Sequence, residues 1–180
     1  MAGHRILFTL QLAFSTFLLQ SCEGVWYHFL TGKPDSEDKT VFVNLTKFPN
    51  GTIHSYKTKY DGQNCYQMGP VELKMETKTQ PMTFSNVYKT CHLSNLALLH
   101  IQNPKEPYQI VKVETKNNYD VKSGNCVSRS GTYFVVLTQT TNPSSDMLSD
   151  IRNDLLGLGI ALLKKQDLSV CPVNKVGHKM

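Results

Sequence analysis

The amino-acid sequence predicts an all-β protein: an eight-stranded, up-and-down antiparallel barrel with one C-terminal α-helix packed outside it. Three observations support this fold class. Eight short runs with β-type alternation follow one another and are separated by brief turn-forming segments. Several of these runs are apolar on one face only, which is typical of strands that enclose an interior. Near the C-terminus the hydrophobic period lengthens to that of an amphipathic helix.

Turn-forming residues delimit the predicted strands. The tightest turn signal is Pro49-Asn50-Gly51, and polar segments at 32–38 and 117–130 separate other strands. A barrel of eight strands encloses room for packed side chains and one small ligand. The strands are expected at 25–31, 39–48, 52–60, 71–78, 82–88, 92–101, 108–116 and 131–140.

The run 71–78 shows the clearest alternation in the chain. Val71, Leu73 and Met75 alternate with charged residues, so one face of this strand is expected to be dry and the other wet. Gly69-Pro70 just before it indicates a bend or bulge.

The run 52–60 places its aromatic residues and its lysines on opposite faces. Tyr56 lies on the side that could offer a hydroxyl group to a ligand, and Lys57 and Lys59 share the other side.

The helical period appears after residue 142. The segment 142–146 supplies an N-cap and an acidic residue in the first turn, and Gly157 and Gly159 are expected to end the helix. A single apolar stripe must pack against the outer wall of the barrel. The expected stripe is Leu148, Ile151, Leu155, Leu158 and Leu162.

The first 22 residues resemble a secretory signal peptide, with Arg5 before an apolar core. The sequence Leu19–Cys22 also loosely resembles a bacterial lipoprotein box. The sequons at Asn44 and Asn50 favour a secreted, glycosylated chain. We therefore expect one barrel domain at 23–172 and a tail at 173–180, in an extracellular protein.

Four cysteines lie beyond the signal segment: Cys65, Cys91, Cys126 and Cys171. In a secreted chain they predict two disulfides, for which three connectivities exist. No CxxC pair and no cysteine–histidine cluster is present, so no metal site and no cofactor are expected.

Charge and motifs disfavour several other classes of function. The formal net charge is +5, and the basic residues are spread along the chain instead of clustered, so nucleic-acid binding is not expected. No Gly-X-Ser-X-Gly motif occurs, and Glu72 and Glu76 belong to the wet face of a strand, so no enzyme is expected. No later apolar run reaches 18 residues, which predicts no stable membrane insertion. We expect a monomer.

Gly24-X-Trp26, the order of eight strands and one helix, and the positions of Cys65 and Cys171 together resemble the lipocalin family over residues 24–172. The segment 40–65 is most similar to α1-acid glycoprotein and apolipoprotein M, with salivary lipocalins of blood-feeding arthropods as an alternative. The chain departs from the family pattern at 138–140, which lacks the family's arginine, and at 115–119, where the Thr-Asp-Tyr motif is degraded.

The resemblance implies that Gly24 and Trp26 form the floor of the barrel and that Cys65 pairs with Cys171. Cys91 and Cys126 are then left for the second disulfide.

The function expected from this resemblance and from the dry strand faces is a secreted carrier of a small hydrophobic or amphipathic ligand. An alternative is a protein that binds a partner through its outer surface, with 32–38 and 117–130 as contact loops. The expected cavity wall is Val41, Val43, Leu45, Tyr56, Val71, Leu73, Met75, Phe84, Leu99, Val111 and Val113.

Overall fold

The computed structural model describes residues 23–33, 39–60, 62–77, 79, 81–102, 107–120, 123–161 and 163–171. The expected signal peptide at 1–22 and the tail at 173–180 lie outside these residues, and both stay predictions. The elements are β1 (Gly24–Thr31), β2 (Lys39–Lys47), β3 (Ile53–Tyr60), β4 (Cys65–Thr77), β5 (Met82–Tyr88), β6 (Cys91–Gln102), β7 (Tyr108–Asp120), β8 (Asn125–Thr138), α2 (Ser145–Gly157), β9 (Lys164–Lys165) and the 3₁₀ turn η1 (Leu168–Val170).

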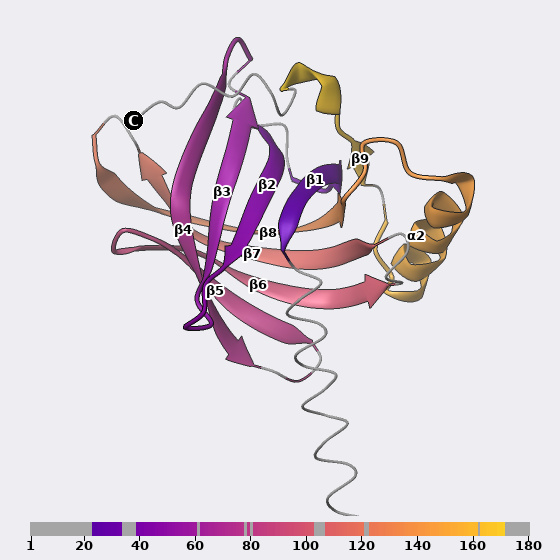
Figure 1. The fold of residues 1–180 in the computed structure, drawn as a ribbon, viewed down its shortest axis with the longest axis horizontal. Coiled ribbons are helices and arrows are strands. Elements are labelled where there is room, and N and C mark those ends of the chain that lie inside the picture. The colour runs from indigo at the N-terminus through magenta and orange to yellow at the C-terminus, as the bar shows by residue number, and fades with distance from the viewer. Residues whose placement is uncertain are drawn as a thin grey trace, which may run out of the picture.

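The first eight strands form a closed antiparallel barrel (Figure 1). Each strand pairs with its neighbours in sequence, and β1 closes the ring by pairing with both β2 and β8. The short β9 pairs with β1 over Leu30 and Thr31. The helix α2 packs outside, so the predicted fold class is confirmed, and the architecture is the lipocalin fold.

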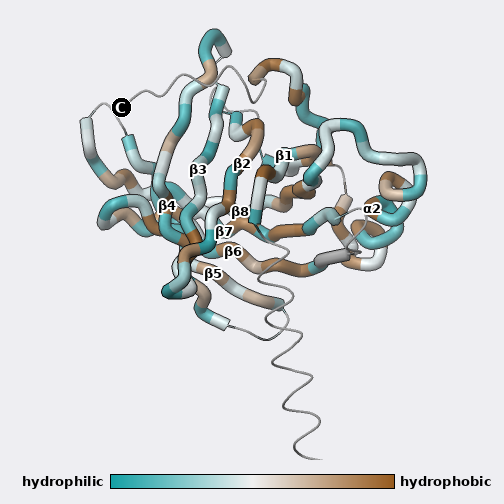
Figure 2. Tube along the Cα trace, in the orientation of Figure 1, coloured by the Kyte–Doolittle hydropathy of each residue, from teal (hydrophilic) through white to brown (hydrophobic). Residues whose placement is uncertain are grey.

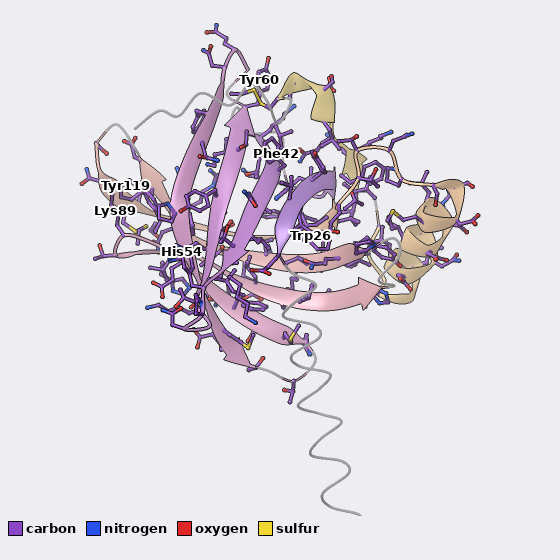
Figure 3. The ribbon with its side chains drawn as sticks, in the orientation of Figure 1. Trp26, Phe42, His54, Tyr60, Lys89 and Tyr119 are labelled. Atoms are coloured by element: carbon purple, nitrogen blue, oxygen red, sulfur yellow. A yellow bond between two sulfur atoms is a disulfide. The ribbon has the colours of Figure 1, made fainter. Side chains whose placement is uncertain are left out.

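The polar segment 117–130 is not the connection that we expected. Instead, β7 continues to Asp120 and β8 starts at Asn125, so the two strands form a long hairpin with pairs such as Tyr119 with Cys126. Its polar composition misled the prediction, because the ladder here uses backbone groups and leaves the side chains exposed. Lys89 Nζ donates to the Tyr119 hydroxyl at 2.8 Å, which holds the hairpin to the β5–β6 turn (Figure 3).

Apolar and polar residues alternate along the strands (Figure 2), and the inward set forms the main core. Trp26 is 0% exposed and lies in this core, with Val43 as its register partner on β2. At 138–140, where the chain has no arginine, Gln139 Nε2 donates to the Glu23 carbonyl at 3.3 Å. A neutral amide therefore joins the last barrel strand to the chain next to Gly24.

The helix begins and ends as the sequence predicts. The Ser144 hydroxyl accepts a hydrogen bond from the Met147 N–H at 3.1 Å, which caps the first turn. Gly159 has φ +67°, and its N–H and that of Ile160 donate to helix carbonyls at 3.0 and 2.9 Å. This is a Schellman motif, and a side chain with a Cβ would be strained at Gly159.

The buried face of α2 differs from the predicted stripe. Met147, Ile151 and Leu155 are buried, whereas Leu148 and Leu158 are exposed. The three buried residues are four positions apart, and this row faces the barrel. Leu162 lies outside the described residues. The helix face packs on outward side chains of the barrel, including Tyr108, Ile110, Val136 and Leu99.

A polar contact joins the helix to the barrel beside this apolar face. The Tyr108 hydroxyl donates to the Asp154 carboxylate, and His100 Nε2 lies 3.1 Å from the same carboxylate. The His100 ring stacks on the Tyr108 ring with centroids 5.5 Å apart. Burial, and then the hydrogen bond to Asp154, raise the pKa of Tyr108, so the phenol stays a donor.

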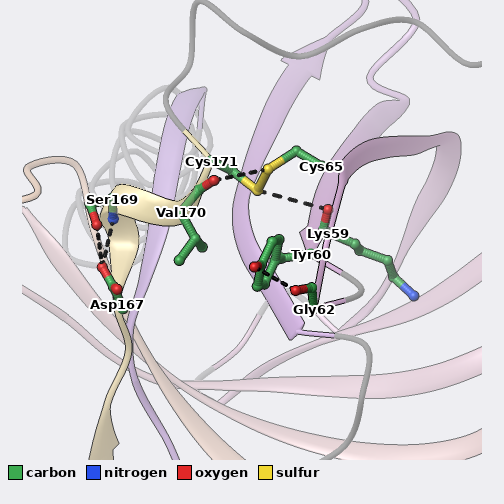
Figure 4. Close-up of a disulfide and its surroundings, with 8 residues drawn as sticks. All are labelled: Lys59, Tyr60, Gly62, Cys65, Asp167, Ser169, Val170 and Cys171. Carbon is green, nitrogen blue, oxygen red and sulfur yellow. Dashed lines mark hydrogen bonds between the residues drawn. A yellow bond between two sulfur atoms is a disulfide. The ribbon is translucent and has the colours of Figure 1, made fainter.

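Two disulfides are present, Cys65–Cys171 and Cys91–Cys126, as the resemblance implied. Figure 4 shows the first of them, which ties the C-terminal segment to the start of β4. Cys171 packs there with Val41 and Phe42. The second joins the start of β6 to the β7–β8 hairpin. Because β4, β6 and β8 all start at one end, both disulfides lie at that end, which we call the rim.

The helix face predicts the effect of two matched substitutions. Ile151→Ala should lower the free energy of unfolding by about 2–5 kcal/mol, because it leaves a cavity between α2 and the barrel. Leu156→Ala, at a side chain that is 70% exposed, should change it by less than about 0.5 kcal/mol. Urea denaturation followed by circular dichroism measures both. Equal losses would contradict the observed helix face.

The two disulfides should differ in what they contribute to stability. They close loops with sequence separations of 106 and 35 residues. The chain-entropy treatment then gives losses of about 4.7 kcal/mol for Cys65→Ser/Cys171→Ser and about 4 kcal/mol for Cys91→Ser/Cys126→Ser. Urea titrations of the two double variants measure the difference. A larger loss for the shorter loop would show that native packing, not loop entropy, dominates.

Candidate functional site

The barrel encloses a deep cavity of about 130 Å³ that is lined by residues from β1 to β8. Its walls are mainly aliphatic, and we call it the deep chamber. An engineered apolar cavity of about 150 Å³ holds a benzene molecule, so this chamber accommodates a ligand portion of similar size. The lining residues are His28, Thr40, Val43, Leu45, Ile53, Ser55, Lys57, Leu73, Phe84, Asn86, Ser94, Leu96, Leu98, Gln109, Val111, Val113, Tyr133, Val135 and Leu137.

Six of the predicted wall residues line this chamber. They come from β2, β4, β5 and β7. On these strands the side chains alternate between the two faces of the sheet, so the apolar positions two residues apart identify the inner face. Whether they touch a ligand stays a prediction. They are Val43, Leu45, Leu73, Phe84, Val111 and Val113.

Three other predicted residues are buried or half-buried but lie outside the chamber. Met75 packs against the main core, and Val71 packs with Met68 and Leu93 nearer the rim. Val41 lies beside Cys171 under the C-terminal segment and lines a separate cavity of about 360 Å³. Its strand has an irregularity between Thr40 and Phe42, which takes Val41 out of phase with Val43.

Leu99 was assigned to the wrong face of the barrel. It packs in the outer cluster under α2, and its neighbour Leu98 lines the deep chamber instead. The β6–β7 register shifts between Leu98 and His100, and this bulge allows adjacent residues to serve different cores.

Tyr56 was also assigned to the wrong face. Ser55 and Lys57 line the deep chamber, so Tyr56 points outward, where it packs close to Gly69. The prediction placed the aromatic residue inside and treated the lysine as belonging to the opposite face. The signal that could have found Lys57 is its alternation with Ile53 and Ser55.

Two further cavities, of about 180 and 360 Å³, lie toward the rim and share lining residues with the deep chamber. Thr40 and Tyr133 line all three cavities. His28 lines the deep chamber and the larger outer cavity, and Lys57 lines the deep chamber and the smaller one. We call these four residues the neck, because they surround the level at which the cavities meet.

The two nitrogen bases of the neck both have lowered pKa values. Burial, and then the charges of Lys59 and Lys33, lower the pKa of Lys57 from 10.5 to about 7. Burial, and then the charges of Lys57 and Lys33, lower the pKa of His28 from 6.5 to about 3. Both residues are half-buried, and both line the deep chamber.

The remaining polar groups of the interior are hydroxyls and amides. Burial raises the pKa of Tyr133, so its hydroxyl stays protonated and can donate. Asn86 Nδ2 donates to Ser94 Oγ at 3.1 Å, while its buried Oδ1 has no hydrogen-bond partner among the described residues. This oxygen is an acceptor for a water molecule or for a ligand.

The predicted glycosylation sites lie on accessible surface. Asn50 is exposed in the β2–β3 turn, where its side chain accepts from the Thr52 N–H at 3.0 Å. Asn44 is half-buried on the outer face of β2, opposite Tyr56. Occupancy of either sequon stays a prediction.

Over the described residues, no three or more His, Cys, Asp or Glu side chains gather as metal ligands would. No helix within the same residues has the length and apolar character needed to cross a membrane.

Comparison with known proteins finds likeness in structure alone. No protein-family model matches the chain, and no curated protein matches it. Among solved structures it is similar to lobster apocrustacyanin A1, with 16% identity, 90% of each chain covered and a TM-score of 0.58. It is also similar to apocrustacyanin C2, with 15% identity, 90% of each chain covered and a TM-score of 0.57. For apocrustacyanin C1 the identity is 14%, the coverage of each chain 89% and the TM-score 0.54. At these identities the likeness shows the fold only.

The lowered pKa of Lys57 predicts a specific pH dependence of stability. Between about pH 7 and 10.5 the unfolded chain holds a proton that the folded chain has released, so stability should rise with pH across this window. Below pH 7 the full penalty of burying the charge is present. Thermal denaturation from pH 6 to 10 measures the effect. In Lys57→Met the rise should be smaller; an unchanged pH profile would contradict a buried, neutral Lys57.

Proposed function

We propose that this protein is an extracellular carrier of the lipocalin type, which binds a small hydrophobic or amphipathic ligand inside its barrel. The observation that carries this proposal is the deep chamber, which lies inside the barrel, is mainly apolar and shares lining residues with two wider cavities at the rim. Cavities of this kind bind ligands through burial of apolar surface, and a few polar groups set the orientation. Two disulfides and the expected signal segment support an extracellular location.

The mainly apolar wall of the deep chamber supports a binding function. The polar residues that line the deep chamber are Lys57, His28, hydroxyls and amides, and none of the described residues adds a carboxylate to it. The likeness of segment 40–65 to α1-acid glycoprotein and apolipoprotein M, or to salivary lipocalins, stays a proposal about subtype.

The second candidate is a protein that binds a partner through its outer surface. The β7–β8 hairpin supports it, because its residues 125–132 are exposed and Val127 is 52% exposed. In this case substitutions in the hairpin would abolish the biological effect, whereas substitutions in the deep chamber would not.

Filling the deep chamber should abolish ligand uptake. The neutral fluorescent probe N-phenyl-1-naphthylamine should brighten on binding the wild-type protein. Val113→Trp fills the chamber and should weaken probe binding at least about tenfold, since the ligand loses its apolar contacts. Lys112→Trp, on the outward face of the same strand, is the matched control and should bind as the wild type does.

Overpacking can itself destabilise a core by about 1–3 kcal/mol, so near-ultraviolet circular dichroism should confirm that each variant is folded. Val111→Phe is a milder filling variant for the same purpose. Probe binding by folded Val113→Trp at wild-type affinity, or no probe binding by the wild type, would refute a carrier function of the chamber.

A further inference from the structure

We propose that the ligand is an anionic amphiphile with a short apolar body, whose carboxylate is held at the neck by Lys57 and the Tyr133 hydroxyl. This inference rests on the proposed carrier function and adds the charge and size of the ligand. It follows from three features of the interior: the sign of its charges, their position, and the volume beneath them.

The charged residues around the deep chamber and the smaller outer cavity are all basic. Lys57, Lys33, Lys59 and Arg129 line these two cavities, and no carboxylate from the described residues does. Lys57 takes part in no ion pair within the part of the chain that the structure describes, and the charges that act on it are those of other lysines. A buried cation without a counter-ion is costly, and an anionic ligand would remove that cost.

The position of Lys57 separates an apolar region from a polar one. Below it, on the floor side, the chamber wall is formed by residues such as Leu73, Leu98 and Val135. Toward the rim, the cavities are lined by lysines, by Arg129 and by hydroxyl groups. An amphiphile with its tail in the chamber therefore has its head at the level of Lys57.

Tyr133 supplies a second hydrogen-bond donor at the level of Lys57, from a different strand of the barrel. It lies on β8, whereas Lys57 lies on β3, and both line the deep chamber and the smaller outer cavity. A carboxylate accepts from an ammonium and from a phenol in charge-assisted hydrogen bonds, which are stronger in a site of low dielectric. His28 is neutral above about pH 3 and adds a neutral donor or acceptor, not a competing charge.

The acidic side chain on the third cavity does not compete for this role. Asp167 lines the larger outer cavity, where its carboxylate accepts from the Ser169 N–H at 3.0 Å and from the Ser169 hydroxyl at 2.6 Å. These hydrogen bonds lower the pKa of Asp167 and hold it within its own turn. The other titratable groups that line this cavity are His28, Lys33, Lys39, Tyr60, Tyr133, Lys164 and Lys165.

The volume of the deep chamber limits the length of the ligand. At about 130 Å³ it matches a cavity that holds one aromatic ring, and it is below the 300–1,000 Å³ typical of drug-sized ligands. A short or medium acyl chain fits this space, with its carboxylate at the neck. A long-chain acid would have to leave part of its chain among the charged residues of the rim.

Isothermal titration calorimetry with a matched pair of probes tests the proposal. Octanoate and 1-octanol share a chain and differ in the charge of the head group. At pH 7, wild-type protein should bind octanoate at least about tenfold more tightly than octanol, because only the carboxylate pairs with Lys57. In Lys57→Met this preference should fall to about one, with octanol affinity unchanged. Lys74→Met, at an exposed lysine on the outer face of β4, should behave as the wild type.

Each other outcome has a definite meaning. Equal affinity of the wild type for octanoate and octanol, or octanoate preference retained in Lys57→Met, overturns the inference but leaves a neutral-ligand carrier standing. Binding of N-phenyl-1-naphthylamine without binding of either octyl probe also overturns the inference alone. Failure of the wild type to bind all three probes overturns the proposed function itself.

A second readout follows the proton on Lys57. At pH 8 free Lys57 is mainly neutral, and a bound carboxylate favours the ammonium form. Octanoate binding should therefore take up on the order of one proton, which calorimetry in phosphate and Tris buffers measures. Affinity should fall as the pH rises above 7. Lys57→Met should take up none, and proton uptake that survives this substitution would contradict the assigned role.

The chain also carries carboxylates at Asp35, Glu37 and Asp38, in a segment outside the described residues. Carbon-13 NMR titration of Lys57 Cε in the ligand-free protein shows whether these carboxylates, instead of a ligand, supply the counter-ion of Lys57. Titration near pH 7, and an upward shift on adding octanoate, support the proposal. A pKa of Lys57 near 10.5 in the wild type that falls in the triple variant Asp35→Asn/Glu37→Gln/Asp38→Asn would show that the chain supplies its own counter-ion. This result would overturn the proposal.

Discussion

Closure of the sheet through β1 is the constraint on which the other features of the structure depend. β1 pairs with β2 along one edge and with β8 along the other, so the barrel has no open edge between its first and last strands. Once the sheet is closed, every strand has one face inside and one face outside. The inner faces form the main core and the deep chamber, and the outer faces receive α2 and the C-terminal segment. The phase of each strand therefore decides which residues can meet a ligand.

The strands and the helix could be predicted from local sequence patterns, because strand alternation, turn residues and the helical period are properties of neighbouring residues. They identified eight strands, the helix with its Ser144 cap and Gly159 end, and the inward residues of regular strands such as β4 and β7. They failed at Leu99, where irregular pairing with β7 shifts the phase. Such a bulge depends on the partner strand, which a local pattern does not contain.

The prediction at Tyr56 and Lys57 failed for a chemical reason. A lysine next to an aromatic residue on a strand is ordinarily the solvent-facing one of the two, and the ordinary preference is reversed here. Reversals of this kind are expected where a protein gives up stability for a function, and an interior amine with no ion-pair partner among the described residues fits that expectation. The helix stripe failed for a geometric reason: Met147 and Leu148 are adjacent apolar residues, and only the packed barrel distinguishes them.

On strand β8, adjacent residues belong to two different cores, the main core inside the barrel and the cluster under α2. Val135 and Leu137 point into the barrel, whereas Val136 between them is fully buried under α2. One backbone separates the ligand space from the helix, and β6 repeats the arrangement at Leu98 and Leu99. Close-packed regions of a protein transmit small displacements. Because the same strands contact the chamber and α2, we expect a spectroscopic label on the outside of the helix to report on a molecule that it never touches.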